Sequence, residues 1–209
     1  MTDTVYTIGH SNHPAEKLIG LLKRHSITAV CDVRSQPHSR MNPQFNRDTL
    51  KDALHAENIK YVFLGKELGA RSDDDTCYIN GQVQYDLLAK TTLFKHGITR
   101  VKDGASTYRI ALMCAEKEPL DCHRTILVAR ELFAEGINVK HIHANGELEE
   151  HAHAIERLIL KLGIPQNDMF RSNDEVVSEA YSRQSNEIAY RESPAPNELV
   201  DQGTSRATR

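Results

Sequence analysis

Short apolar runs alternate along the chain with longer stretches in which apolar side chains recur at helical spacing. The short runs are typical of buried strands and the longer stretches of amphipathic helices. Strands that alternate with helices predict a mostly parallel sheet with helices on both faces. The five expected strands cover residues 4–8, 27–33, 59–64, 108–114 and 137–143.

The spaces between these strands are long enough for helices. We expect Gly136 to end the helix that begins at Cys122 in a left-handed conformation. In the simpler interpretation of its start, Asp121 caps this helix. We expect Gly97 to interrupt the helical stretch that precedes the fourth strand. The expected helices cover residues 14–22, 46–54, 83–102, 122–134 and 147–162. The fold class is therefore α/β, a single three-layer domain over residues 1–165.

The composition changes after Pro165. From Arg171 onwards large apolar residues are few, and Ser, Asn, Glu, Arg and Pro dominate. Such a segment cannot bury enough surface to offset its chain entropy. We therefore predict a largely disordered polar tail over residues 166–209, with no more than a short transient helix between residues 174 and 181. This tail is available to bind a protein partner.

The charge balance and the cysteines narrow the functional class. The net charge is only −3, with 26% charged residues, which argues against a protein that coats nucleic acid but leaves room for a local basic cleft. The chain has no apolar run long enough to span a membrane and no signal-like start, so we expect no membrane association and a cytoplasmic protein. Four cysteines without a dense framework indicate thiols or ligands in a reducing compartment.

Reactive and charged side chains follow the predicted strands where they end. Because the carboxyl ends of parallel strands meet at one edge of the sheet, we expect these side chains to lie together. They are His10 and Ser11 after the first strand, Asp32, Arg34 and Ser35 after the second, Lys66 and Arg71 after the third, and Cys114, Glu116, Cys122, His123 and Arg124 after the fourth.

Our first hypothesis is an enzyme, a hydrolase or transferase, that acts on a nucleotide, a phosphorylated metabolite or a nucleic-acid end. A helix that begins at Cys122 would present free N–H groups to an anion and favour the thiolate. Packing of that thiol against the sheet edge is the simpler alternative. The catalytic candidates are Cys122, His10, Asp32 and Glu116. The substrate-binding candidates are Ser11, Arg34, Ser35, Arg71, His123 and Arg124.

Two other functions stay open. Cys114 and Cys122, with His123 or His10, offer ligands for zinc or iron in a hydrolase or redox protein, although no cofactor is required by the sequence. Adjacent Cys and His on one helix point about 100° apart, which opposes binding of one ion by both. The third function is a non-catalytic sensor of nucleotides or nucleic acid that recruits a partner through the tail.

The remaining thiols and imidazoles suggest no site. Cys31 reads as a buried strand residue and Cys77 as a loop thiol. Four histidines alternate on the fifth strand and the last helix, and we expect them to form a solvated rim. They are His141, His143, His151 and His153.

Several of these fragments together resemble the family called domain of unknown function 488, over about residues 4–162. The resemblance implies a compact α/β domain with recurrent polar residues on one edge, and it supplies no settled activity. Lys66 lies where this chain varies from the family's glycine-rich turn, whereas Arg71 matches it. The fragments are Thr7-Ile-Gly-His-Ser11, Asp32-Val-Arg-Ser35 with Pro37, Ser39 and Phe45, Tyr61 to Gly65 with Gly69 and Arg71, and Leu112-Met-Cys-Ala-Glu116 with Cys122-His-Arg124.

Overall fold

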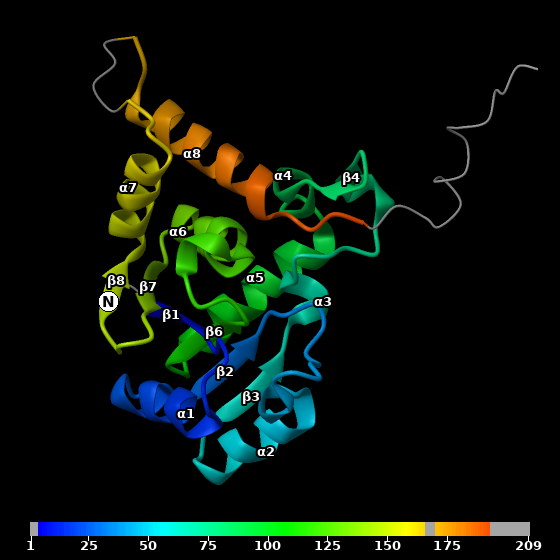
Figure 1. Ribbon diagram of the computed structural model, residues 1–209, viewed down its shortest axis with the longest axis vertical. Coiled ribbons are helices and arrows are strands. Elements are labelled where there is room, and N and C mark those ends of the chain that lie inside the picture. Colours follow the sequence, from blue (N-terminus) through cyan, green and yellow to red (C-terminus); the bar gives the residue numbers. More distant parts are fainter. Residues whose placement is uncertain (1–3, 166–169, 193–209) are drawn as a thin grey trace, which may run out of the picture.

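A six-stranded sheet forms the centre of the molecule in the computed structural model, which describes residues 4–165 and 170–192. The strand order is β3-β2-β6-β1-β7-β8, and every pair is parallel except β7 with β8 (Figure 1). The α/β class and all five expected strands are confirmed, and β8 is an additional strand. The bounds are β1 Thr4–Gly9, β2 Ala29–Asp32, β3 Lys60–Phe63, β6 Ile110–Cys114, β7 Asn138–Ile142 and β8 Leu148–Glu150.

Helices cover both faces of this sheet, as the alternation of elements predicts (Figure 1). One face carries α1 (Ala15–Arg24) and α2 (Arg47–Ala56). The other carries α5 (Thr92–Ala105), α6 (Arg130–Ala134) and α7 (His151–Lys161), and α8 (Asn173–Ile188) packs against α7 and against residues 124–129. Short elements connect them: α3 Gly65–Leu68, α4 Tyr85–Leu88, the hairpin of β4 Tyr78–Ile79 and β5 Gln82–Val83, 3₁₀ turns at Pro43–Phe45, Asp75–Cys77 and Pro119–Asp121, and a π-helix at Arg124–Ala129.

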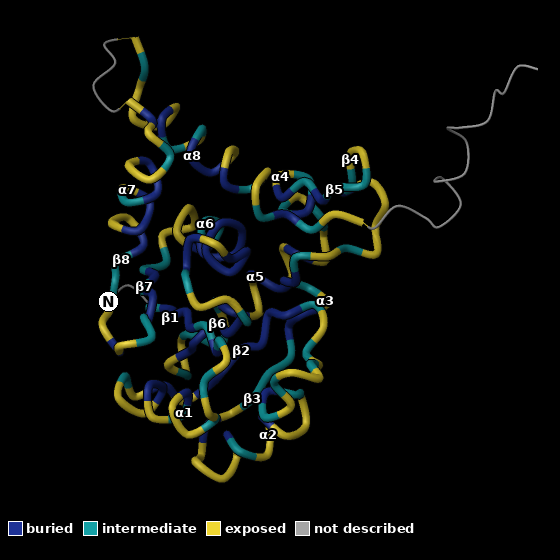
Figure 2. The backbone as a smooth tube through the Cα atoms, viewed as in Figure 1, coloured by how far each residue is buried: buried dark blue, intermediate teal, exposed yellow. Residues whose placement is uncertain are grey.

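The central strands supply apolar side chains to two cores. Successive residues of a strand point to opposite faces, so a strand buried on both faces is apolar throughout. Cys31 and Leu112 therefore pack under α5 and α6, whereas Val30 and Met113 pack under α1 and α2. Figure 2 shows the central strands β1, β2 and β6 buried between the helices, whereas the edge strands β3 and β8 are only partly buried.

The helix expected at Cys122 is present but begins immediately after it, so Cys122 itself lies outside the helix. The 3₁₀ turn at Pro119–Asp121 precedes it, and Cys122 is extended, with φ −138° and ψ 138°. His123 is the N-cap of the π-helix at Arg124–Ala129. Asp121 does not cap the helix but pairs with Lys161 at 2.8 Å.

Two further boundaries differ from the expected ones. Gly97 lies inside α5, and the interruption falls before it, because the Thr91 hydroxyl accepts a hydrogen bond from the Phe94 N–H and starts a new helix. At Gly97 a Cβ would lie 2.8 Å from the Leu68 side chain, so this glycine permits close packing of α3 on α5. Gly136 has a φ of +82°, as expected for a left-handed helix end.

The tail is ordered over much of its length, which corrects the prediction of disorder from residue 166. Ser172 and Glu175 form a capping box that starts α8, a helix of 16 residues. Val176 and Tyr181 are buried on one side of α8, and the Gln184 side chain donates a hydrogen bond to the Leu120 carbonyl oxygen at 2.8 Å. Residues 166–169 and 193–209 of the predicted tail lie outside the described residues. In the described ranges, no helix has both the length and the apolar character needed to cross a bilayer.

Candidate functional site

Two sulfurs, an imidazole nitrogen and a carboxylate converge at the end of β6. The donor atoms of Cys114, Glu116, Cys122 and His123 all lie within 4.8 Å of one another. The Nδ1 of His123 is 3.7 Å from the sulfur of Cys114 and 3.9 Å from that of Cys122. We call these four residues the Cys–His cluster.

The chain path after β6 produces this convergence. β6 ends at Cys114, and the loop and 3₁₀ turn that follow return the chain to the same edge. Because Cys122 is extended and His123 is helical, their side chains are not separated by the angle of a regular helix. The geometric objection to a shared ion therefore does not apply to this structure.

A backbone contact fixes the tautomer of His123. Its Nε2 lies 3.0 Å from the carbonyl oxygen of Val33, which can only accept, so Nε2 carries the hydrogen. The lone pair of a neutral His123 then lies on Nδ1, facing both sulfurs. Histidines that bind metals are commonly oriented by such a second contact.

The Glu116 carboxylate stands beside Cys122, with Oε2 2.8 Å from the sulfur. Two negative charges do not coexist at this distance without a cation, so one of the two groups keeps a proton in the absence of one. Although burial opposes it, a hydrogen bond from Cys114 and the charge of Arg124 hold the pKa of Cys122 well below its usual value. Burial, with the Cys122 sulfur alongside, raises the pKa of both Glu116 and Cys114.

The imidazole is affected in the opposite direction. Burial lowers the pKa of His123, but its contacts with Cys122 and Glu116 outweigh burial and raise it. A proton shared between imidazole and thiolate is thus favoured when no metal is present.

Arg124 supports the loop from inside the protein. Its side chain has no exposed surface, and it donates to the carbonyl oxygens of Glu116 at 2.8 Å and Lys117 at 3.4 Å. Gly9 makes room for this contact, since a Cβ there would lie 1.8 Å from the Glu116 carbonyl oxygen. The geometry makes Arg124 a positioning residue, because its donors face the protein and not solvent.

Arg34, Asp32 and His10 form a second buried network. Arg34 makes two hydrogen bonds to the Asp32 carboxylate, at 2.9 and 2.7 Å, and Tyr61 donates to the same carboxylate at 2.7 Å. Arg34 also lies 3.1 Å from Nε2 of His10, whose Nδ1 contacts the Ser11 carbonyl at 2.7 Å. Burial lowers the pKa of His10 to about 4. Both nitrogens of His10 are therefore engaged in a neutral ring.

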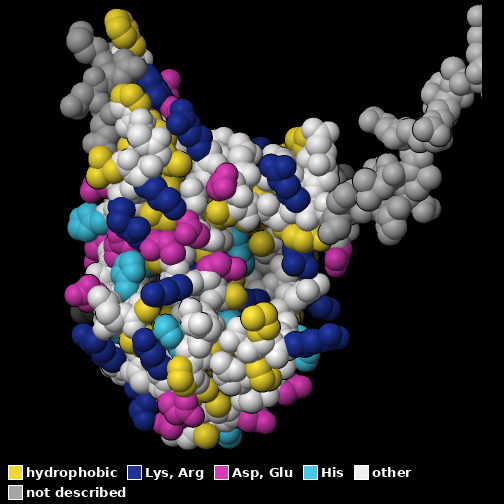
Figure 3. Space-filling view, viewed as in Figure 1, with side chains coloured by type: hydrophobic (Ala, Val, Ile, Leu, Met, Phe, Trp, Pro, Cys, Tyr) yellow, Lys and Arg dark blue, Asp and Glu magenta, His cyan; other side chains and the backbone are white. Residues whose placement is uncertain are grey.

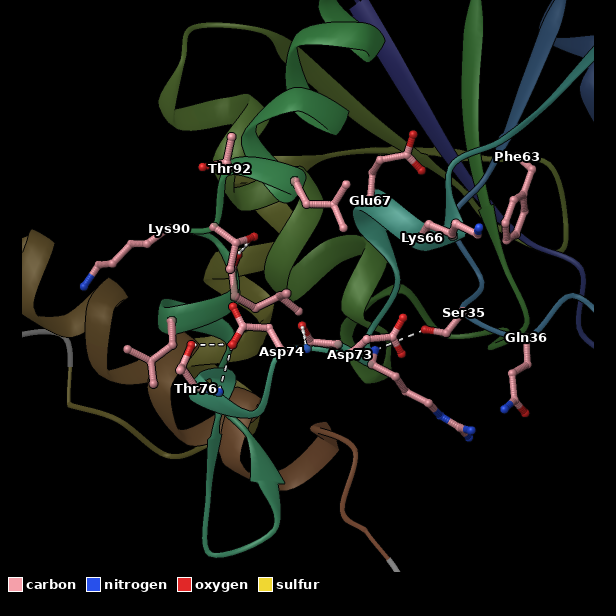
Figure 4. Close-up of a pocket in the computed structure, with 17 residues that line it drawn as sticks. Ser35, Gln36, Phe63, Lys66, Glu67, Asp73, Asp74, Thr76, Lys90 and Thr92 are labelled. Atoms are coloured by element: carbon pink, nitrogen blue, oxygen red, sulfur yellow. Dashed lines mark hydrogen bonds between the residues drawn. The ribbon is translucent and has the colours of Figure 1, made fainter.

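A cavity of about 410 Å³ opens over the Cys–His cluster, and a larger one of about 1150 Å³ adjoins it. Ser35, Gln36 and Arg71 line both. Figure 4 shows the larger cavity, with Ser35 and Gln36 on one side and Thr76, Lys90 and Thr92 towards the other. The two cavities together provide a path from the cluster to solvent.

The structure divides the candidate residues into two groups. Those that line the smaller cavity are Arg34, Ser35, Arg71, Cys114, Glu116, Cys122 and His123. Those that do not are Ser11 and the buried residues His10, Asp32 and Arg124. Lys66 lines only the larger cavity. Sequence reasoning missed Tyr85 and Tyr190, which also line the smaller cavity. The one available signal was Tyr190 itself, an aromatic residue in a polar segment.

Two of the histidines expected on a solvated rim are buried instead. His141 lies 2.8 Å from the Thr7 hydroxyl and 3.0 Å from His151, which in turn contacts the Tyr181 hydroxyl at 2.8 Å. This chain of hydrogen bonds links β1 and β7 to α8. The expectation is wrong because α8 packs against α7 and covers His151.

The family model described as "Domain of unknown function DUF488" matches residues 14–130, more than half of the chain. The matched range includes the whole Cys–His cluster but neither β1 nor α8. Searches of curated proteins and of solved structures find no match to the chain.

Proposed function

We propose that this chain, which belongs to the DUF488 family, binds a zinc ion through Cys114, Cys122 and His123 and uses it for hydrolysis. The separation of the donor atoms carries the proposal. Sulfur and nitrogen ligands of a tetrahedral zinc ion lie about 3.6 Å apart, given Zn–S and Zn–N distances of about 2.3 and 2.05 Å. The observed separations are 3.7 and 3.9 Å.

The fourth position favours a catalytic site over a structural one. Structural zinc sites are closed by four protein ligands, whereas catalytic sites keep one position for water. Glu116 lies too close to the Cys122 sulfur, at 2.8 Å, for both to be ligands without movement. Glu116 lines the cavity with part of its surface exposed, while its carboxylate is shielded from solvent against the cluster. We assign Glu116 as the residue that would act as a general base toward a water activated by the metal.

The rest of the site fits this function. Val33 fixes the tautomer of His123, Arg124 holds the loop that carries Glu116, and the cavity provides access for a substrate. All four cysteines, each in the described residues, are free. We propose a cytoplasmic location, because a reducing compartment keeps the thiols of Cys114 and Cys122 available as ligands.

Elemental analysis of the full-length chain, purified without a metal-affinity tag, tests the proposal. We expect about one zinc per chain, with loss of zinc in Cys114→Ser, Cys122→Ser and His123→Gln. Glu116→Gln should retain zinc, which separates a base from a ligand. Replacement of zinc by Co²⁺ should give the intense visible absorption of a tetrahedral thiolate site. A chain with no metal, and no uptake of added zinc, would refute the metal centre.

A thiolate enzyme is the second candidate, because Cys122 lies 2.8 Å from Glu116 and 3.9 Å from His123. In that case Cys122 is a nucleophile and its neighbours transfer protons. The same experiment distinguishes the two: a metal-free chain whose Cys122 is rapidly alkylated, with Cys114→Ser harmless to that reactivity, favours the nucleophile.

A further inference from the structure

Of the three candidate arginines Arg34, Arg71 and Arg124, only Arg71 is exposed. Arg34 is engaged by Asp32, and Arg124 by backbone carbonyls. Arg71 is exposed and lines both cavities. In the described part of the chain, no carboxylate forms an ion pair with it. Its donors are free for a ligand.

The ring of Tyr190 supports that guanidinium. The Arg71 guanidinium carbon lies 4.2 Å from the centre of the Tyr190 ring, in a cation–π contact. Stacking occupies one face of the guanidinium and leaves the N–H groups at its edge available. Those N–H groups are the ones that bind a carboxylate or phosphate with two parallel hydrogen bonds.

Both partners are held by their backbones. The Arg71 N–H donates to the Ser35 hydroxyl at 3.1 Å. The Tyr190 carbonyl accepts from the Val83 N–H at 3.0 Å, and the Glu192 N–H donates to the Gly81 carbonyl at 2.8 Å. These hydrogen bonds fix the segment after α8 beside the cavity. The stacked Arg71 and Tyr190 side chains are therefore held in place in the cavity lining.

The acidic groups nearby limit the kind of anion. Asp73 and Asp74 line the larger cavity, which disfavours a long polyanion there. On the face shown in Figure 3, the described acidic and basic side chains are interspersed and form no extended area of one sign. Glu67 and Asp121, by contrast, pair with Arg100 and Lys161.

We propose that the substrate is a small molecule that carries one anionic group, a phosphate or a carboxylate, and that Arg71, positioned by Tyr190, binds this group. The inference rests on the proposed function, because it places the anion in the cavity where the Cys–His cluster would act. It makes α8 and the segment after it part of the substrate site, although they lie outside the family match.

Alkylation of Cys122 by two reagents tests the proposal without a known substrate. Iodoacetate carries a carboxylate, whereas iodoacetamide is neutral and of similar size. The full-length chain is treated with chelator and reductant, and the rate at Cys122 is followed by peptide mass spectrometry. Arg71→Gln should lower the ratio of the iodoacetate to the iodoacetamide rate by about fivefold, the upper range for an exposed ion pair. Lys90→Gln, which removes a charge from the larger cavity alone, should change the ratio less than twofold.

Two further measurements separate the role of Tyr190 from that of Arg71 and identify the preferred anion. Tyr190→Phe should keep the ratio, and Tyr190→Leu should lower it about twofold, because only the ring positions Arg71. Inorganic phosphate or acetate, added as a competitor, should slow the reaction with iodoacetate, and the stronger competitor shows which anion the site prefers.

The outcomes are decisive for this site alone. An unchanged ratio in Arg71→Gln, or an equal fall in Lys90→Gln, would overturn the proposal. So would a Cys122 that neither reagent reaches. A chain that lacks zinc but shows the Arg71 effect would refute the metal centre and retain the anion site. A chain that binds zinc but does not show the Arg71 effect would retain the metal centre and refute the anion site.

Discussion

Acid should destabilise the folded chain through the buried imidazole of His151. Burial lowers the pKa of His151 from 6.5 to about 4. Between these two values the unfolded chain binds more protons than the folded one, so the free energy of unfolding falls as the pH falls. With an unfolded pKa of about 6.5, the loss between about pH 8 and pH 5 amounts to about 2 kcal/mol for this one residue.

Urea denaturation at the two pH values measures that loss. In His151→Gln the difference in free energy of unfolding between pH 8 and pH 5 should shrink by about 2 kcal/mol. His153→Gln, an exposed histidine on the same helix, should leave the difference unchanged. His10 has a similarly lowered pKa and is present in all three proteins, so its contribution cancels. If His151→Gln keeps the full difference, the imidazole is not buried in its neutral form and the reasoning fails.

Three other outcomes follow from the site. Asp32→Asn should cost about 3–5 kcal/mol in urea unfolding, because it leaves Arg34 as a buried unpaired cation, whereas Lys23→Met, at an exposed ion pair, should cost less than about 1 kcal/mol. Equal costs would contradict this account. Gly9→Ala would place a Cβ 1.8 Å from a carbonyl oxygen of the loop after β6, so zinc content should fall, whereas Gly20→Ala, which meets nothing within 4 Å, should keep it. Competition with a chelator should show zinc affinity rising from about pH 6 to pH 8, because the metal displaces protons from its ligands, and a flat profile would exclude thiolate ligands.

The sheet could be predicted because its strands are buried on both faces. A strand such as β6 reads as an unbroken apolar run, and no other local structure gives that pattern with helices between the runs. β8 and α8 could not be predicted, because they lack such an apolar pattern. β8 contains Leu148 between polar residues, and α8 buries few apolar side chains in a polar sequence, so their stability comes from partners distant in the chain.

The location of the site could be predicted from topology, but the roles of its residues could not. Parallel strands bring their carboxyl ends to one edge, so Arg34 and Cys114 were expected near each other. Burial then distinguishes side chains of the same type. Arg124 and Arg71 are both arginines at that edge, yet one faces carbonyl oxygens and the other faces solvent. No local pattern separates them, because the difference depends on how the loop after β6 packs against Gly9.

The balance of charge at the Cys–His cluster favours a divalent cation there. Arg124 is fully buried and has no carboxylate partner among the described residues, so it contributes one positive charge close to Cys122. Without a metal, the raised pKa values of Cys114 and Glu116 indicate that these two groups keep their protons, and a third proton is shared between Cys122 and His123. With Zn²⁺ bound, Cys114, Cys122 and Glu116 would all be ionised, and their three negative charges would equal the two of zinc plus the one of Arg124. Zinc binding would therefore displace protons from Cys114, from Glu116 and from the Cys122–His123 pair, and this exchange is the origin of the pH dependence expected for zinc binding.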